Sequence, residues 1–289
     1  LGMLAAVITR TKHRVHIFQG EVWAASKGFN RWLLKSMDTI TAYCATTLLA
    51  VSQSEKQFLE RQRVARVGKV SVLGAGSISG VDLIRFGPNA TFRDHIRRQY
   101  NIPDDAVVCL FLGRLVVDKG IRELVAAFKI SACDNRRLWL MMVGPDEEGE
   151  AANLRRLVPQ GVSDRIVIEG FTSTPEQYLA AADLLCLPSY REGFGMVMLE
   201  AAATNIPTIG SRIYGISDAI VENSTGLLVA VANVGELSDA ISMLSLSSDE
   251  RQKMGKAGRS RVEAEFEQGL VVDRYAQFFK ELVLNEKIS

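Results

Sequence analysis

The feature that most constrains the fold of this chain is an alternation of short apolar runs with amphipathic stretches between residues 107 and 229. The runs VVCLFLG and LWLMMVG are typical, and several others end in Gly or Pro, where a chain turns. Continuous apolar strands separated by helices indicate a parallel sheet covered on both faces, and ligands of such sheets bind beyond the carboxyl ends of the strands. We expect strands at 107–113, 138–144, 166–170, 184–188, 207–210 and 226–229, with helices at 121–130, 150–157, 175–182, 195–204 and 235–246.

Residues 1–80 repeat this pattern less completely. They predict a helix that ends near Arg10, strands at 14–18, 47–52 and 69–73, and helices at 30–45 and 54–65. This is a partial second α/β unit that lacks its opening strands. Because the sequence starts at Leu1 inside a helical pattern, we expect a preceding part of the protein to be absent.

A connection between the two units is predicted by the Gly- and Ser-rich segment 74–89. We therefore expect a first unit at 1–80, a second unit at 81–270, and a final helix at 271–289 that docks back toward the first unit. One face of that helix is apolar, which favours docking. The residues on this face are Val271, Val272, Tyr275, Phe278, Phe279, Leu282 and Val283.

Charge is distributed unevenly along the chain. Residues 1–80 hold eleven Lys and Arg against four Asp and Glu, whereas residues 81–289 hold 23 against 29. A basic part joined to an acidic part suggests different partners, and an anionic membrane surface is one partner of the basic part. Solvated helix faces are the alternative.

The chain has four scattered cysteines, Cys44, Cys109, Cys133 and Cys186. They fit a reducing compartment, so we expect the protein in the cytoplasm. Together with the basic first part, this suggests a location at the inner face of the plasma membrane.

Membrane contact has one specific candidate in the first unit. Lys27, Arg31 and Lys35 recur at helical spacing, while Trp32 and other apolar residues recur on another side. A basic amphipathic helix of this kind lies on anionic lipid. A helix packed on its own sheet with a basic outer face has the same pattern, so both interpretations stay open.

The segment GRLVVDKG follows the first strand of the second unit and delivers Arg114 and Lys119 to one loop. Arg offers a planar fork and Lys a mobile point charge, so together they suit a diphosphate. Loops carry such residues routinely, and the segment alone is a weak signal.

The segment REGFGMVMLE places Glu192 and Glu200 around a Gly193-Phe194-Gly195 turn that opens a helix. The first N–H groups of a helix form an anion site. Eight helical residues span about 12 Å, whereas the carboxylates of a retaining glycosidase lie about 5–5.5 Å apart. The spacing therefore favours two separate acceptors for ligand hydroxyls over a catalytic carboxylate pair. A capping Glu and a solvated Glu are the structural alternative.

Several common site patterns are missing from the sequence. It has no strand–helix GxGxxG, GxxxxGK[ST] or GxSxG motif. It has no DxD, and its three histidines do not pair with cysteines, so we expect neither a metal nor a cofactor. A basic recognition helix is also absent, which argues against nucleic-acid binding.

Taken in order, GRLVVDKG, VGPDEEG, IVIEGF, AADLLCLPSYREGFGMVMLEAAATNIPTIGS and STGLLV resemble the retaining glycosyltransferases of family 4. The resemblance covers nearly all of 69–289, and RVHIFQGEVW and LLAVSQSEKQFL are similar to the later half of that family's N-terminal domain. It implies the α/β GT-B architecture, in which two Rossmann-like domains face a cleft, with the N-terminal domain incomplete here. The details are most similar to the family members that build capsular and exopolysaccharides.

The resemblance also implies roles for individual residues. Arg114 and Lys119 would neutralise the donor diphosphate, and Glu192 would bind the donor sugar. Glu200 would hold the ribose hydroxyls. The remaining donor-binding positions would be Gly113, Gly144, Phe171, Thr172, Gly193, Phe194 and Gly195.

The implied function is transfer of a sugar from a nucleotide-diphosphate donor, UDP-linked by preference, to a lipid-linked or growing polysaccharide acceptor, without a metal. A nucleotide-binding module without turnover is one alternative, and another GT-B enzyme such as an epimerase or phosphorylase is a second. The chain departs from the family at Gln19, where many members have His, and at Tyr214 and 204–206. We expect these departures to reshape the sugar pocket.

Overall fold

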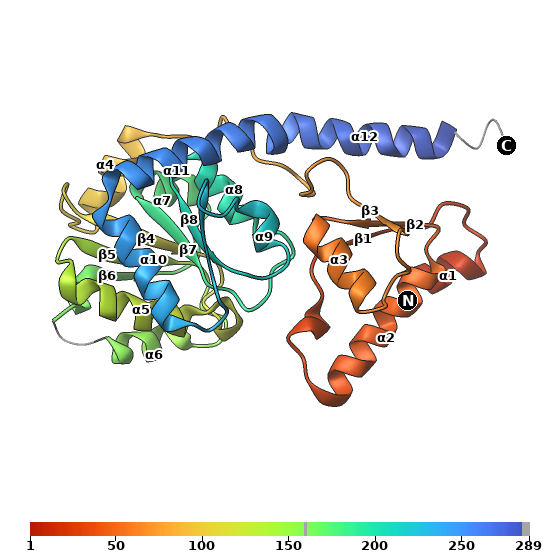
Figure 1. The fold of residues 1–289 in the computed structure, drawn as a ribbon, viewed down its shortest axis with the longest axis horizontal. Helices are drawn as coiled ribbons and strands as arrows, with labels where there is room; N and C mark the ends of the chain where they lie inside the picture. Colours follow the sequence, from red (N-terminus) through yellow and green to blue (C-terminus); the bar gives the residue numbers. More distant parts are fainter. Residues whose placement is uncertain (159–160, 285–289) are drawn as a thin grey trace.

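The computed structural model describes residues 1–158 and 161–284. It contains two parallel sheets, one of three strands in the order β1-β2-β3 and one of six in the order β6-β5-β4-β7-β8-β9. Figure 1 shows the smaller sheet with α1–α3 as one lobe and the larger sheet, with helices on both faces, as the other. We call these the N-lobe and the C-lobe. The α/β fold class with parallel sheets is thereby confirmed.

The N-lobe elements agree with the sequence prediction to within a few residues, and Ser52 caps α3 by accepting from the Glu55 amide at 3.1 Å. Strand β1 pairs with β2 from Val15 opposite Thr47. The elements are α1 Gly2–Ile8, β1 Val15–Phe18, a 3-10 turn Val22–Ala24, α2 Gly28–Cys44, β2 Thr47–Ala50, α3 Gln53–Arg61 and β3 Val70–Ser71.

The C-lobe contains all six predicted strands. Each arises from a continuous apolar run without polar alternation, which is the pattern of a strand buried on both faces of the sheet. The strands are β4 Val107–Leu112, β5 Leu138–Val143, β6 Ile166–Glu169, β7 Leu184–Leu187, β8 Thr208–Ser211 and β9 Gly226–Val229. The helices are α4 Ala90–Gln99, α5 Ile121–Asp134, α6 Glu150–Leu157, α7 Pro175–Ala181, α8 Met196–Ala203, α9 Ile216–Ala219, α10 Val234–Leu246, α11 Ser248–Arg261 and α12 Gln268–Leu284. Two 3-10 turns (Val117–Lys119 and Ser163–Arg165) and a π turn (Val262–Phe266) complete it.

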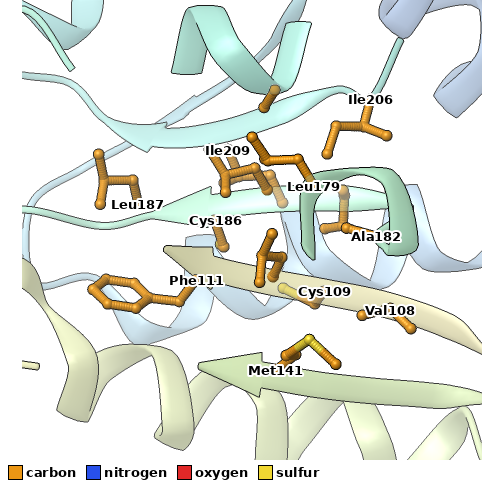
Figure 2. Packing of buried hydrophobic residues seen from close by; sticks show 14 of the residues in the cluster. Val108, Cys109, Phe111, Met141, Leu179, Ala182, Cys186, Leu187, Ile206 and Ile209 are labelled. Atoms are coloured by element: carbon orange, nitrogen blue, oxygen red, sulfur yellow. The ribbon is translucent and has the colours of Figure 1, made fainter. Parts of the chain in front are cut away.

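The main hydrophobic core lies in the C-lobe, between the six-stranded sheet and its helices. Helix α5 packs against α10, and α4 packs against α7. Figure 2 shows Cys109 of β4 and Cys186 of β7 among the apolar side chains of this core, and both thiols are free. These two cysteines therefore act as small apolar residues.

Helix α12 runs from the C-lobe along the N-lobe side of the molecule (Figure 1). Tyr275 donates from its hydroxyl to the Ser77 carbonyl at 3.2 Å, which ties the helix to the segment between the lobes. Only Val271 of the predicted docking face is buried, and Phe279 and Val283 are 41% and 55% exposed. Docking through the whole apolar face is thus not seen, and the boundaries at 80 and 270 stay predictions.

Candidate functional site

The carboxyl ends of the C-lobe strands face the N-lobe, and the two lobes meet there backbone to backbone. Gly20, which follows β1, has a φ of +96°, and a Cβ on it would lie 2.9 Å from the Gly193 Cα. A Cβ on Gly193 would in turn collide with the Gln19 carbonyl. The turn after β7 is therefore held against the turn after β1, and glycine is required at both positions.

Lys119 and Glu192 form an ion pair in this region. The Lys119 Nζ lies 2.6 Å from the Glu192 Oε1, and both side chains are only 15% exposed. The Ser189 hydroxyl also donates to this oxygen at 3.1 Å. Lys119 closes the loop after β4 and Glu192 follows β7, and these strands are neighbours. The fold thus brings two predicted site residues into contact.

Arg114 lies at the same end of β4 but is more open. Its Nη1 is 2.9 Å from the Glu147 Oε2, with side chains 46% and 50% exposed, and Glu147 raises the pKa of the guanidinium further. Ion pairs this exposed are worth about 0–1 kcal/mol, so an incoming phosphate can replace Glu147 at little cost.

Gly113 and Gly144 have a structural task at the ends of β4 and β5. Their N–H groups donate to the carbonyls of Val143 and Glu169 at 3.0 and 3.2 Å, so neither amide is directed at a ligand. A Cβ on Gly144 would collide with the Gly113 carbonyl. The two glycines allow the loops that carry Arg114 and Glu147 to approach, and a direct donor contact stays a prediction.

The turn at 193–195 leads into α8, as the sequence predicted. Gly195 adopts the left-handed conformation with a φ of +74°. The Phe194 ring is 5% exposed and packs on Phe266 at 5.6 Å between centroids, which anchors the turn in the core. The Met198 amide donates back to the Gly195 carbonyl at 2.8 Å, but the Met196 and Val197 amides lie too early in α8 to have a partner within the helix, so this turn can receive an anion.

Glu200 lies one turn inside α8, in surroundings distinct from those of Glu192. Burial raises the pKa of its carboxyl, Glu176 raises it further, and Arg85 acts in the opposite sense. Arg85 is bound to the Glu176 carboxylate at 2.8 Å and to the Ser173 carbonyl at 3.1 Å. The sequence reasoning missed Arg85 and Glu176, because their segments carry no motif that sets them apart.

The loop after β6 borders this region and supplies the remaining predicted donor residues. Phe171 is 76% exposed. Thr172 accepts from the Thr174 amide at 3.1 Å, which shapes the turn between them. The exposed ring of Phe171 and the backbone of this turn are available to a flat ligand group.

The contact between the lobes contains Tyr214, which the sequence analysis expected to reshape the sugar pocket, together with residues to which that analysis gave no role. Tyr214, after β8, stacks on Phe58 of α3 at 4.5 Å, and Phe58 stacks on Trp23 at 5.3 Å. Ser54 donates to Asp218 through both its amide and its hydroxyl, and the Gly215 amide donates to the Ser54 hydroxyl at 2.8 Å. These contacts join residues far apart in sequence, so no local sequence pattern predicts them.

The expectation that residues 204–206 reshape the sugar pocket is wrong. Residues 204–206 precede β8 and therefore lie at its amino end, away from the turns that form the site. Asn205 adopts a φ of +62°, and a Cβ on Gly255 of α11 would collide with its carbonyl. This segment supports the packing of α11 and does not shape a sugar pocket, whereas Tyr214 does lie at the site.

Helix α2 presents a different face from the one expected. Arg31 and Lys35 lie over the Trp23 ring at 5.2 and 5.5 Å, and both donate to the side-chain amide oxygen (Oε1) of Gln62, so they face the interior of the N-lobe. Trp32 is 62% exposed. The other exposed apolar residues of this helix are Phe29, Leu33, Met37, Ile40 and Tyr43. The outer face of α2 is therefore apolar rather than basic.

Residues 1–158 and 161–284 contain neither a membrane-spanning helix nor a cluster of metal ligands. No helix in these ranges is long and apolar enough to cross a bilayer. No three His, Cys, Asp or Glu side chains in them come together as metal ligands.

Comparison with known proteins identifies the kind of site. Residues 92–261 match the family described as glycosyl transferases group 1. The chain is 29% identical over 286 residues to the capsular polysaccharide biosynthesis glycosyltransferase CapM of Staphylococcus aureus, which covers 97% of this chain and 74% of CapM. It is 32% identical over 214 residues to a GDP-mannose-dependent alpha-(1-6)-phosphatidylinositol monomannoside mannosyltransferase of Mycobacterium tuberculosis, which covers 70% of this chain and 54% of that protein.

Solved structures share the fold. Sucrose-phosphate synthase of Thermosynechococcus elongatus superposes with a TM-score of 0.83 at 25% identity, covering 98% of this chain and 72% of that one. Anabaena HepE in complex with UDP and glucose has a TM-score of 0.82 at 19% identity, covering 96% and 74%. These likenesses confirm the predicted GT-B architecture. The chain spans about three quarters of the length of these structures and of CapM, and about half that of the mannosyltransferase.

Proposed function

The chain belongs to the glycosyl transferases group 1 family, and from this we propose that it is a retaining, metal-independent hexosyltransferase of surface polysaccharide synthesis. It would transfer a sugar from a UDP-linked donor to a lipid-linked or growing polysaccharide acceptor. The observation that carries this proposal is the Lys119–Glu192 pair beside Arg114 and the first turn of α8. Resemblance to the capsular protein CapM supports the acceptor class.

In this proposal, the cations act on the leaving diphosphate. Negative charge develops on the diphosphate as the glycosidic bond breaks, and Arg114, Lys119 and the free amides at the start of α8 stabilise it. Donor binding would replace Glu147 at Arg114 with a phosphate. It would also divide the Lys119–Glu192 pair between the two ends of the bond, with Lys119 on the phosphate and Glu192 on the sugar hydroxyls.

Glu200 and the loop after β6 would bind the nucleoside. The half-buried Glu200 carboxylate has no need to pair with Arg85, which is bound to Glu176, so its oxygens are available to two ribose hydroxyls. Phe171 and Thr172 would border the base. The test is calorimetry of the chain with UDP and with GDP. We expect binding that weakens in Glu200→Ala, and binding of neither nucleotide would refute the donor assignment.

Three alternatives to transfer give different products. A nucleotide-binding module would bind UDP without turnover when UDP-sugar and a lipid acceptor are supplied. A GT-B epimerase would release epimerised donor, and a phosphorylase would cleave its substrate only with phosphate present. Product analysis of one incubation distinguishes these outcomes, and we expect acceptor-dependent release of UDP.

We also propose that the N-lobe rests on an anionic membrane through α2. The exposed residues Phe29 and Trp32 would enter the lipid interface, as the outer face of this helix is apolar. A cavity of about 720 Å³ near the end of the helix is lined by Tyr43 together with Arg63, Arg66 and Lys69, so cations lie beside apolar surface. Lys27, at the start of α2, adds a charge. Lipid phosphates attract such a combination.

A further inference from the structure

Two carboxyl groups are buried where the N-lobe meets the turn at 193–195, which we call the donor turn. The mechanism proposed above uses neither of them. Glu55 of α3 is fully buried, and Glu21, which follows the Gln19-Gly20 turn, is 2% exposed. Burying a carboxyl group is costly unless it is neutralised or hydrogen-bonded. Their position therefore calls for a physical reason.

Glu55 spans two segments of the N-lobe. It is the third residue of α3, and a Ser-x-x-Glu sequence at a helix start usually turns the Glu back onto the amide of the capping Ser. Here Ser52 is the cap, but the Glu55 carboxylate accepts from Gly20 N at 2.5 Å and from Val51 N at 2.9 Å. The carboxylate thus fixes the turn after β1 to the end of β2.

Glu21 completes the pair. Both of its carboxyl oxygens are buried without a hydrogen-bond partner within the described residues. Its own amide donates to the Tyr214 hydroxyl of the C-lobe at 3.3 Å. The Glu21 backbone therefore contacts the C-lobe directly, while its side chain lies beside Glu55.

The two groups are chemically unequal. Burial, reinforced by Glu55, raises the pKa of Glu21 to about 8, and burial raises that of Glu55 to about 7 although two amides stabilise its anion. Asp38 also acts on Glu21, and Asp218 acts on Glu55. Burial, with Glu21 and Glu55 adding to it, raises the pKa of Tyr214, and burial with Glu55 raises the pKa of Tyr275 on α12. The tyrosines stay neutral, whereas Glu21, Glu55, Asp38 and Asp218 are carboxyl groups that repel one another when ionised, so one proton on Glu21 relieves repulsion.

We propose that Glu55 is a positioning residue: its buried carboxylate, which accepts from the Gly20 and Val51 amides, holds the Gln19-Gly20 turn against Gly193 of the donor turn. The consequence for transfer rests on the proposed function, since Gly193 adjoins the Glu192 assigned to the sugar. The effect on the contact between the lobes does not depend on that function.

The test is amide hydrogen exchange of the whole chain, followed in segments 19–24 and 190–195. We expect Glu55→Gln to speed exchange in both segments about tenfold, because a charge-assisted bond to Gly20 is lost and the turn no longer presses on Gly193. Glu60→Gln is the matched control. It makes the same change on the same helix and also removes a carboxylate that accepts a backbone amide, that of Gly68, away from Gly193. Unchanged exchange at 190–195 in Glu55→Gln would overturn the proposal.

Glu21→Gln provides a second test, in which the expected result is better-retained protection and therefore cannot be caused by unfolding of the variant. The pKa values of the pair are raised in the closed contact, so the contact holds an extra proton and weakens as pH rises through about 8. In the natural chain, protection of 190–195, corrected for intrinsic exchange, should fall between pH 6 and 9. Gln cannot ionise, so Glu21→Gln should lose the part of this fall that Glu21 contributes near pH 8, while the part due to Glu55 near pH 7 remains. An identical fall in the variant would contradict the carboxyl pair.

These measurements use no nucleotide or acceptor, so they separate this inference from the proposed function. If UDP does not bind but the exchange results follow, the donor assignment fails and the positioning role stands. If transfer is established, Glu55→Gln should lower kcat about tenfold with little change in UDP affinity, whereas a general loss of structure would weaken both.

Discussion

At the scale of single residues, Glu200 makes a prediction about pH. Burial raises the pKa of its carboxyl, and only the carboxylate can accept two ribose hydroxyls. UDP affinity should therefore fall on acidification, and the fall should begin at a higher pH than an ordinary Glu would give. Glu200→Gln should bind about tenfold more weakly at pH 8 and lose this pH dependence. Calorimetry between pH 5 and 8 checks both, and a variant that keeps the wild-type profile would exclude Glu200 as the titrating group.

Lys119 should matter more to turnover than its charge alone suggests. Lys119→Ala removes the cation from the leaving group and also leaves the half-buried Glu192 carboxylate without its partner. We expect the rate of transfer to fall roughly 100- to 1,000-fold, with poor rescue by Arg, whose planar fork does not fit a point-charge position. Arg122→Ala is the control, because it likewise removes a cation from a buried carboxylate, that of Glu150 at the start of α6. Equal losses in the two variants would refute the assignment.

The sequence identified Lys119 and Glu192 separately but not as a pair. Seventy-three positions separate them, and their contact depends on β4 and β7 being neighbours in the sheet, which no local pattern reveals. Glu55 was missed for a different reason. Ser52-x-x-Glu55 has the spacing of an ordinary helix cap, and only the fold shows that the carboxylate continues to Gly20.

At the scale of elements, the turn at Gly193 is the most constrained connection. A methyl group there would meet the Gln19 carbonyl, which belongs to the backbone and cannot rotate away. Gly193→Ala should separate the two turns, reduce transfer at least tenfold, and destabilise the chain by about 1–3 kcal/mol. Gly87→Ala is the control, because its new methyl group would make only ordinary contacts, the nearest at 3.5 Å. Thermal unfolding and a transfer assay measure the two effects, and normal transfer in Gly193→Ala would show that the turns need not touch.

The predicted strands were found because their apolar runs are local signals, whereas three helices of the described residues, α4, α9 and α11, were not predicted. Helix α11 buries Met254 and two glycines, Gly255 and Gly258, and no broad apolar stripe marks its inner face. Glycine has a low helix propensity, so local sequence preference argues against a helix in this segment. The glycines are needed because Gly255 lies against the Asn205 carbonyl and Gly258 against Ala202. Tertiary packing therefore determines that this segment is helical. Helix α4 is amphipathic, and the sequence analysis did not predict it.

At the scale of the whole molecule, the uneven charge follows the two lobes. Residues 1–80, which carry the excess of basic residues, form the N-lobe, while the acidic remainder carries the candidate site at the ends of its strands. The sequence predicted this division and the position of α2. It did not predict which face of α2 is exposed, because the spacing of Arg31 and Lys35 is the same whether they face solvent or Trp23.

The exposed face of α2 makes the last prediction, which concerns membranes. The chain should bind vesicles that contain phosphatidylserine, and binding should weaken as salt is raised, because cations near the cavity at Tyr43 contribute at long range. Trp32→Ala should reduce the partition coefficient about tenfold by removing an exposed ring from the interface. Ile130→Ala, at an exposed apolar position of α5 in the C-lobe, should leave it unchanged. If both variants bind as the natural chain does, α2 does not contact lipid, and its apolar face must be covered by protein instead.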